Sequence, residues 1–254
     1  MLWRNRRESS NVVIGKKMGG SLGVGGLIVG ALIYYFMGGN PADFVAQNTG
    51  GFQQEVAMDE DQKKFISVVL ADTEDVWNDV FAQSNLTYQE PKLVLFSGRV
   101  QSACGTASSA VGPFYCPPDQ QLYLDLTFFE QLSSKLGASG DFAMAYVVAH
   151  EVGHHVQHLM GHTKSSVNLE LQADCLAGVW AKRTQDAKNV IEEGDIDEAM
   201  NAAAAVGDDR LQKASGREVV PDSFTHGSSA QRVDAFQTGF QRGEAQLCFE
   251  KFKS

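Results

Sequence analysis

A stretch of 22 residues, Met18–Gly39, contains no charged side chain and sets the first limit on the architecture of this chain. A helix of about 20 apolar residues spans the hydrocarbon core of a bilayer. Basic residues on one flank hold that end of a membrane helix in the cytoplasm, and residues 1–17 carry five of them: Arg4, Arg6, Arg7, Lys16 and Lys17. We therefore expect a basic cytoplasmic tail over 1–17, a transmembrane anchor over 18–39, a linker over 40–58 and a folded domain over 59–254.

A cleaved signal peptide is the alternative interpretation of this segment. Its apolar region should be about 7–15 residues long and should end at a small-x-small cleavage site. The sequence that follows here, GGNPADF, has no clean pattern of this kind. An uncleaved single-pass anchor would hold the domain at the inner membrane, on its periplasmic side. Two G-x-x-x-G spacings, Gly19/Gly23 and Gly26/Gly30, could pack two anchors into a homo-oligomer, although chance matches are common in so glycine-rich a segment.

The charge and the periodicity of the remaining residues describe a globular domain. The net charge of −10 argues against nucleic-acid binding, which needs a basic face. Helical periodicity runs over 59–82, 127–136, 141–161, 167–188, 195–214 and 228–242, whereas short strand-like runs occupy 93–96 and 122–126. A small early sheet followed mostly by helices predicts the α+β class.

His150 and His154 belong to an H-E-x-x-H motif inside the predicted helix over 141–161. Residues at i and i+4 share one face of a helix, so the two imidazoles can converge on one metal ion. Glu151 lies one residue on, close enough to reach a water bound to that ion. An apolar run over 142–149 leads into the motif, and polar groups in such a helix need partners when they are buried.

Catalytic zinc needs a third protein ligand and one open coordination position. The metzincin pattern would require Gly at 157 and His at 160, but this chain has Gln157 and Met160, so that class is excluded. The gluzincin pattern takes a Glu from a following helix, and Glu170 lies 16 residues beyond His154 on a predicted helix that can fold back. Asp174, one turn further, could accept an N–H from a ligand histidine and fix the orientation of its ring.

Three stretches, HEVGHHVQ, ELQADCLAG and THGSSAQRV, together with residues 102–125, resemble the bacterial neutral zinc metallopeptidases, the YpfJ-like membrane-anchored proteins. The E-x-x-A-D element is also similar to that of HtpX-type and CAAX-prenyl-type metallopeptidases, in which the Glu is the third zinc ligand. The resemblance spans nearly the whole chain. It implies a zincin-like metallopeptidase domain that holds one Zn²⁺ per chain through His150, His154 and Glu170.

The expected chemistry is peptide-bond hydrolysis by a zinc-activated water. The metal lowers the pKa of the water toward about 7, and Glu151 takes its proton as general base and returns it to the leaving amine. His226 and Arg232 match the T-H-x-x-x-x-x-R spacing of the HtpX-type C-terminal element. His226 is thus the candidate oxyanion donor, with Arg232 positioning it or a carboxylate. Tyr115 and Tyr123 are alternative donors.

The other histidines near the motif, His155, His158 and His162, are not expected to be ligands. His155 lies on the adjacent helix face, where a supporting or surface role is expected. His158 shares the face of the motif but lies about 12 Å from His150 at a rise of about 1.5 Å per residue. His162 follows the expected helix end, where a cation suits the helix dipole.

The four cysteines are expected to form two disulfides, because an extracytoplasmic domain permits them. Cys104 and Cys116 flank a Gly/Ala/Ser-rich loop and can close it. Cys175 can pair with Cys248 and so tether the last helix to the two metal-binding helices. A zinc–thiolate site is the alternative, but the chain contains no C-x-x-C pattern.

A zinc-dependent endopeptidase acting on peptides or proteins is the preferred hypothesis. In zincins an edge strand before the active-site helix binds extended peptide, and by analogy we expect that strand at 112–116 or around Tyr123. A zinc-binding envelope adaptor or structural protein without turnover is the main alternative, and zinc hydrolysis of a non-protein substrate is a third. The intact Glu151 argues against an adaptor, because a degenerate site usually loses its base first.

Overall fold

The computed structural model describes residues 1–15, 59–108, 111–162 and 166–253. The predicted anchor over 18–39, with its glycine spacings, and the predicted linker over 40–58 lie outside the described residues. Within the part that is described, no helix is both long enough and apolar enough to span a bilayer.

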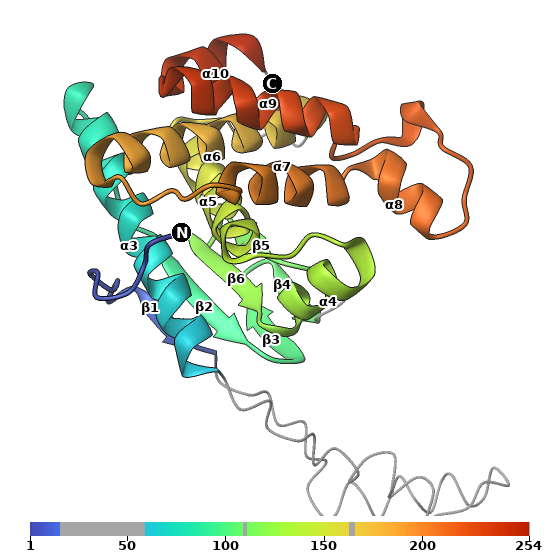
Figure 1. The fold of residues 1–254 in the computed structure, drawn as a ribbon, viewed down its shortest axis with the longest axis horizontal. Coiled ribbons are helices and arrows are strands. Elements are labelled where there is room, and N and C mark those ends of the chain that lie inside the picture. Colours follow the sequence, from blue (N-terminus) through green and yellow to red (C-terminus); the bar gives the residue numbers. More distant parts are fainter. Residues whose placement is uncertain (16–58, 109–110, 163–165, 254) are drawn as a thin grey trace, which may run out of the picture.

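The described residues form an α+β fold, as the sequence predicts (Figure 1). One sheet contains, in spatial order, β1 (Val12–Ile14), β2 (Lys92–Phe96), β6 (Gln121–Asp125) and β5 (Phe114–Cys116). Strands β1, β2 and β6 are parallel, and β5 is antiparallel to β6. A separate antiparallel hairpin joins β3 (Arg99–Ser102) to β4 (Gly105–Ser108). Of the two segments considered for an edge strand, β5 therefore lies at the edge of the sheet and β6 lies inside it.

The helices bury their apolar faces against the sheet and against one another. They are α3 (Glu60–Gln83), α4 (Thr127–Leu136), α5 (Asp141–Leu159), α6 (Val167–Lys188), α7 (Asp195–Ala205), α8 (Asp208–Ala214), α9 (Ser229–Arg242) and α10 (Ala245–Lys251), with a 3-10 turn at Pro221–Ser223. Figure 1 shows the sheet in one half of the molecule and α6, α7, α9 and α10 in the other, with α5 between them. Phe142 of α5 stacks on Trp180 of α6, and both are fully buried, which places the core at this junction.

The predicted single helix over 195–214 is wrong, because the structure breaks it into α7 and α8. Gly207 occupies the break and lies against Ser229, where an added Cβ would come within 2.4 Å of the backbone nitrogen. The close approach of the start of α9 therefore requires glycine here. The break also makes Asp208 the first residue of α8.

Residues 1–15 belong to the folded unit, which corrects the expected separate tail over 1–17. Strand β1 pairs with β2 in the main sheet. Arg6 forms an ion pair with Asp72 of α3 at 2.5 Å, and Arg7 forms one with Glu74 at 2.8 Å; both carboxylates are buried. Basic residues that look like the flank of a membrane helix thus neutralise buried carboxylates, and the folded unit is not confined to 59–254.

Candidate metal centre

Helix α5 presents the H-E-x-x-H motif to a cavity of about 660 Å³. His150 and Glu151 are buried, and His154 is partly exposed. Most of positions 142–156 are buried, and outside the motif nearly all of these buried side chains are apolar. The motif is therefore a polar patch that the fold places on one wall of an otherwise closely packed interior.

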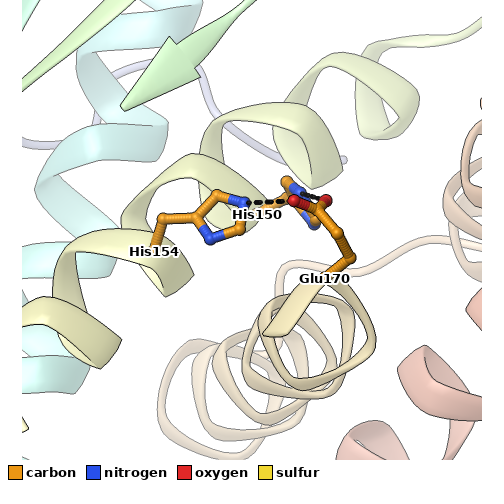
Figure 2. Close-up of side chains that lie close together, drawn as sticks. All are labelled: His150, His154 and Glu170. Carbon is orange, nitrogen blue, oxygen red and sulfur yellow. Dashed lines mark ion pairs between the residues drawn. The ribbon is translucent and has the colours of Figure 1, made fainter. Parts of the chain in front are cut away.

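Glu170, in the first turn of α6, reaches both histidines (Figure 2). His150 Nε2 lies 3.4 Å from one carboxylate oxygen, and His154 Nε2 lies 3.6 Å from the other. One ligand atom from each of the three side chains lies within 4.8 Å of the other two. Two imidazole nitrogens and a carboxylate oxygen at this spacing fit a zinc ion that keeps a fourth position open.

Two close helix contacts bring the polar side chains together. An added Cβ on Gly153 of α5 would lie 3.0 Å from the carbonyl oxygen of Ala173 on α6, which is tighter than ordinary contact. An added Cβ on Gly239 of α9 would lie only 1.8 Å from the carbonyl oxygen of Cys175. Glycine at these positions lets α5 and α9 both pack closely against α6, which supplies carboxylates to the site.

His150 is oriented by the buried carboxylate of Asp174, as the sequence predicts. The imidazole Nδ1–H donates to Asp174 Oδ1 at 2.8 Å, which leaves Nε2 facing Glu170. Asp174 also accepts the hydroxyl of Tyr146 at 2.5 Å and two N–H groups of Arg232 at 2.8 and 2.9 Å. Arg232 therefore pairs with this carboxylate, which is one of the two contacts expected for it.

The side chain of His154 contacts Gln157, a residue for which the sequence suggests no place at the metal centre. His154 Nδ1 lies 2.8 Å from Gln157 Oε1, so this nitrogen is engaged and Nε2 faces Glu170. The spacing is compatible with this contact, because positions i and i+3 meet on one helix face.

Burial and neighbouring charges set the ionisation of the metal centre. Burial raises the pKa of Glu151, although His154 and His150 oppose the shift. Burial would also raise the pKa of Glu170, but hydrogen bonds from both histidines overcome it and lower that pKa strongly. Burial would lower the pKa of His150, but Asp174 and Glu170 raise it to about 9 in the metal-free protein. Glu170 is thus held as an anion, whereas the pKa of Glu151 lies above that of an ordinary carboxyl group.

His226 lines the same cavity, on the loop before α9, with its side chain about half exposed. Its backbone N–H donates to Asp208 Oδ2 at 2.6 Å, as do the N–H groups of Thr225 at 2.7 Å and Gly227 at 3.1 Å. His226 Nδ1 lies 3.2 Å from the other oxygen of Asp208. Asp208 rather than Arg232 therefore holds His226, a role that sequence reasoning did not find.

His155 is buried and bound away from the metal position. Its Nε2–H donates to the carbonyl of Gln89 at 2.6 Å, and its Nδ1 accepts the hydroxyl of Tyr115 at 3.0 Å. Burial lowers the pKa of His155 to about 4, so the ring is neutral.

The hydroxyl of Tyr123 donates to Asp119 at 2.8 Å, and that of Tyr115 donates to His155. Both tyrosines considered as oxyanion donors thus have other acceptors.

One wall of the cavity is apolar. It is lined by Val111, Pro113 and Phe114 before and within β5, by Phe128 of α4 and by Val147 of α5. Val147 lies one helical turn before Glu151, so this wall adjoins the carboxylate. A bulky apolar group placed here would lie beside the polar centre.

Both predicted disulfides are confirmed. Cys104 and Cys116 are bonded with their Cα atoms 5.9 Å apart, which ties the turn of the β3–β4 hairpin to β5. Cys175 and Cys248 are bonded with their Cα atoms 5.7 Å apart, which ties α6 to α10. The zinc–thiolate alternative is wrong, since all four cysteines are used in these bonds.

Comparisons with known proteins agree with this arrangement. Residues 1–251 match the family described as "Putative neutral zinc metallopeptidase". The chain is 45% identical to the uncharacterized protein YpfJ of Escherichia coli (strain K12), over 98% of each chain. It is 43% identical to the uncharacterized protein Rv2575 of Mycobacterium tuberculosis, over 63% of this chain and 62% of the relative. No solved structure matches it. The chain belongs to the putative neutral zinc metallopeptidase family, and the cofactor of this family is Zn²⁺.

Proposed function

We propose that this protein is a zinc-dependent endopeptidase of the gluzincin type. The observation that carries the proposal is the convergence of His150, His154 and Glu170, with Glu151 beside them in one cavity. Each imidazole has its Nδ1 engaged by an acceptor, so each offers Nε2 to the metal. An oriented set of three protein ligands is what a catalytic zinc site requires.

The side chains of the site take separate roles in peptide hydrolysis. A bound Zn²⁺ supplies a Lewis acid and lowers the pKa of a water toward about 7. Glu151 takes the proton of the attacking water and returns it to the leaving amine, and its raised pKa suits both transfers. His226 donates a hydrogen bond to the carbonyl oxygen as negative charge develops there.

We propose that the folded unit works outside the cytoplasm, in the periplasm, and is attached to the membrane through the apolar segment over 18–39. The two disulfides support an oxidising compartment. The proposed substrate is a peptide or protein whose extended backbone pairs with β5, since an edge strand can accept another strand. Association of two anchors through their glycines is a separate prediction.

The test is cleavage of unfolded casein by the full-length protein, with and without a chelator. Glu151→Gln should retain one zinc per chain and lose at least about 100-fold in cleavage rate, because only the base is removed. The matched control is Glu218→Gln, the same change at an exposed position, which should cleave as the unmodified protein does. Cleavage that survives Glu151→Gln would overturn the mechanism.

A second variant tests the ligand set. Glu170→Ala should lose stoichiometric zinc, because two imidazoles alone hold the ion weakly. If the zinc content stays at one per chain, Glu170 is not the third ligand. A protein that binds zinc with the intact ligand set, yet cleaves neither casein nor a peptide library, would instead support the adaptor alternative.

A further inference from the structure

We infer that Gln157 is a positioning residue for His154, and that a hydrogen-bond relay through Gln172 connects this metal-centre histidine to the C-terminal segment of the chain. The inference rests on the proposed zinc site, because its consequence is the orientation of one zinc ligand. The remote part of the fold that holds this ligand is the C-terminal segment, residues 252–253.

The hydrogen bonds of Gln157 determine which way its amide faces. Its Nε2 donates to the backbone carbonyl of Leu169 at 2.6 Å and to Gln172 Oε1 at 3.0 Å. An amide nitrogen has two hydrogens, and both are used in these bonds. The amide oxygen must therefore face His154 Nδ1, which lies 2.8 Å away. An oxygen in that position requires a proton on Nδ1 and leaves Nε2 free for a metal.

Gln172 has its own amide fixed in the same way. Its Nε2 donates to the carbonyl of Phe252 at 3.1 Å, so its oxygen faces Gln157. Both glutamines are at most 1% exposed, so water does not replace a lost partner readily. A buried polar group left without a partner is destabilising. The donor and the acceptor are therefore fixed in all three hydrogen bonds of the relay: His154 to Gln157, Gln157 to Gln172, and Gln172 to the Phe252 carbonyl.

The C-terminal segment that ends the relay is firmly attached to α6. The Cys175–Cys248 disulfide joins α10 to that helix, and Phe252 is buried directly after α10. Asn168 donates to the carbonyl of Lys253 at 2.8 Å from a more exposed position. Two amides of α6 thus bind neighbouring carbonyls of the C-terminal segment, but only that of Gln172 continues toward His154.

The two histidines of the site are consequently held by different chemistry. The acceptor on His150 is the carboxylate of Asp174, which Arg232 pairs. The acceptor on His154 is a neutral amide. The relay therefore selects the ring orientation and tautomer of His154 without adding charge, and loosening its far end should weaken zinc binding.

The experiment measures zinc affinity of the full-length protein by competition with a chromophoric chelator. Gln157→Leu should bind zinc about 10–100-fold more weakly, the usual effect of losing the partner of a ligand histidine. Gln172→Leu should show a smaller loss in the same direction. Asn168→Leu is the matched control, because it also removes a donor to a C-terminal carbonyl but lies outside the relay. It should bind zinc as the unmodified protein does.

Two further measurements separate positioning from general damage. Gln157→Glu keeps an acceptor for His154 and should bind zinc more tightly than Gln157→Leu. In the unmodified protein, ¹⁵N NMR should show His154 protonated at Nδ1, a result that does not depend on whether any variant folds. Protonation at Nε2 instead would overturn the inference.

Two affinity results would overturn it as well. These are unchanged zinc binding by Gln157→Leu, and a loss for Asn168→Leu as large as that for Gln172→Leu. If the unmodified protein itself binds no zinc, the proposed function fails and the inference fails with it. Zinc binding that is insensitive to Gln157 defeats the inference alone.

Discussion

Replacing Arg232 by Met should lower the unfolding free energy of the metal-free protein by about 3–5 kcal/mol. The guanidinium donates to Asp174 at 2.8 and 2.9 Å, and both residues are almost completely buried. Burial opposes the charge of each group, yet the pairing raises the pKa of Arg232 and lowers that of Asp174. Two charge-assisted hydrogen bonds of about 1.5–3 kcal/mol each account for a loss of this size.

The double variant Arg232→Met/Asp174→Leu separates stability from metal binding. Exchanging a whole buried ion pair for apolar side chains is often close to neutral, so this variant should regain part of the lost stability. A remaining deficit of about 1–3 kcal/mol is expected from the hydroxyl of Tyr146, which loses its acceptor. Zinc affinity should stay about 10–100-fold below that of the unmodified protein, because His150 has also lost its acceptor.

Urea unfolding with a chelator present measures the stability, and chelator competition measures the zinc affinity. The exposed Arg217→Met serves as the control and should change stability by no more than about 0.5 kcal/mol. The reasoning is refuted if the double variant is no more stable than Arg232→Met alone. It is refuted equally if zinc affinity returns together with stability.

The same geometry supports four further predictions. Zinc affinity should rise about tenfold per pH unit up to about pH 9, because the metal displaces a proton from His150, whose raised pKa is about 9; a flat profile in competition titrations would contradict this. In the metal-free protein, protonation of His150 should raise the free energy of unfolding. This contribution is complete below about pH 6.5 and disappears as the pH rises through about 9, which urea unfolding at several pH values checks. Gly153→Ala should weaken zinc binding several-fold by pushing Ala173 and its helix away, whereas unchanged affinity would show that α6 can yield. Phe128→Ala should lower kcat/KM for peptides with a bulky apolar residue beside the scissile bond more than for alanine peptides, because Phe128 lines the apolar wall; equal losses would exclude that role.

The parts of the site that follow from local spacing could be predicted from the sequence. His150 and His154 are one turn apart on α5, and Glu170 and Asp174 are one turn apart on α6. Once the two helices fold back on each other, helical geometry alone brings these side chains together. Gln157 follows His154 at a spacing of the same kind, but its amide is oriented by the Leu169 carbonyl and by Gln172, partners that no spacing rule reveals.

The parts that depend on distant contacts could not be predicted. Strand β1 has only three residues, so it shows no measurable alternation, and its pairing with β2 joins segments about 80 residues apart. The charged partners of Arg6 and Arg7 lie on α3, and nothing near the basic residues signals them. Asp208 likewise acts on a loop far along the chain, from a helix start that exists only because Gly207 interrupts the helical pattern.

The pairing of β1 with β2 has a consequence for the sidedness of the protein. Two hydrogen-bonded strands cannot lie on opposite faces of a lipid bilayer, so residues 15 and 59 must emerge into the same compartment. From this pairing we predict that the N-terminus and the folded unit share one compartment, in place of the expected cytoplasmic N-terminus with a periplasmic domain. Reporter proteins fused to either end of the chain should therefore register one and the same compartment, and opposite readings at the two ends would contradict this prediction.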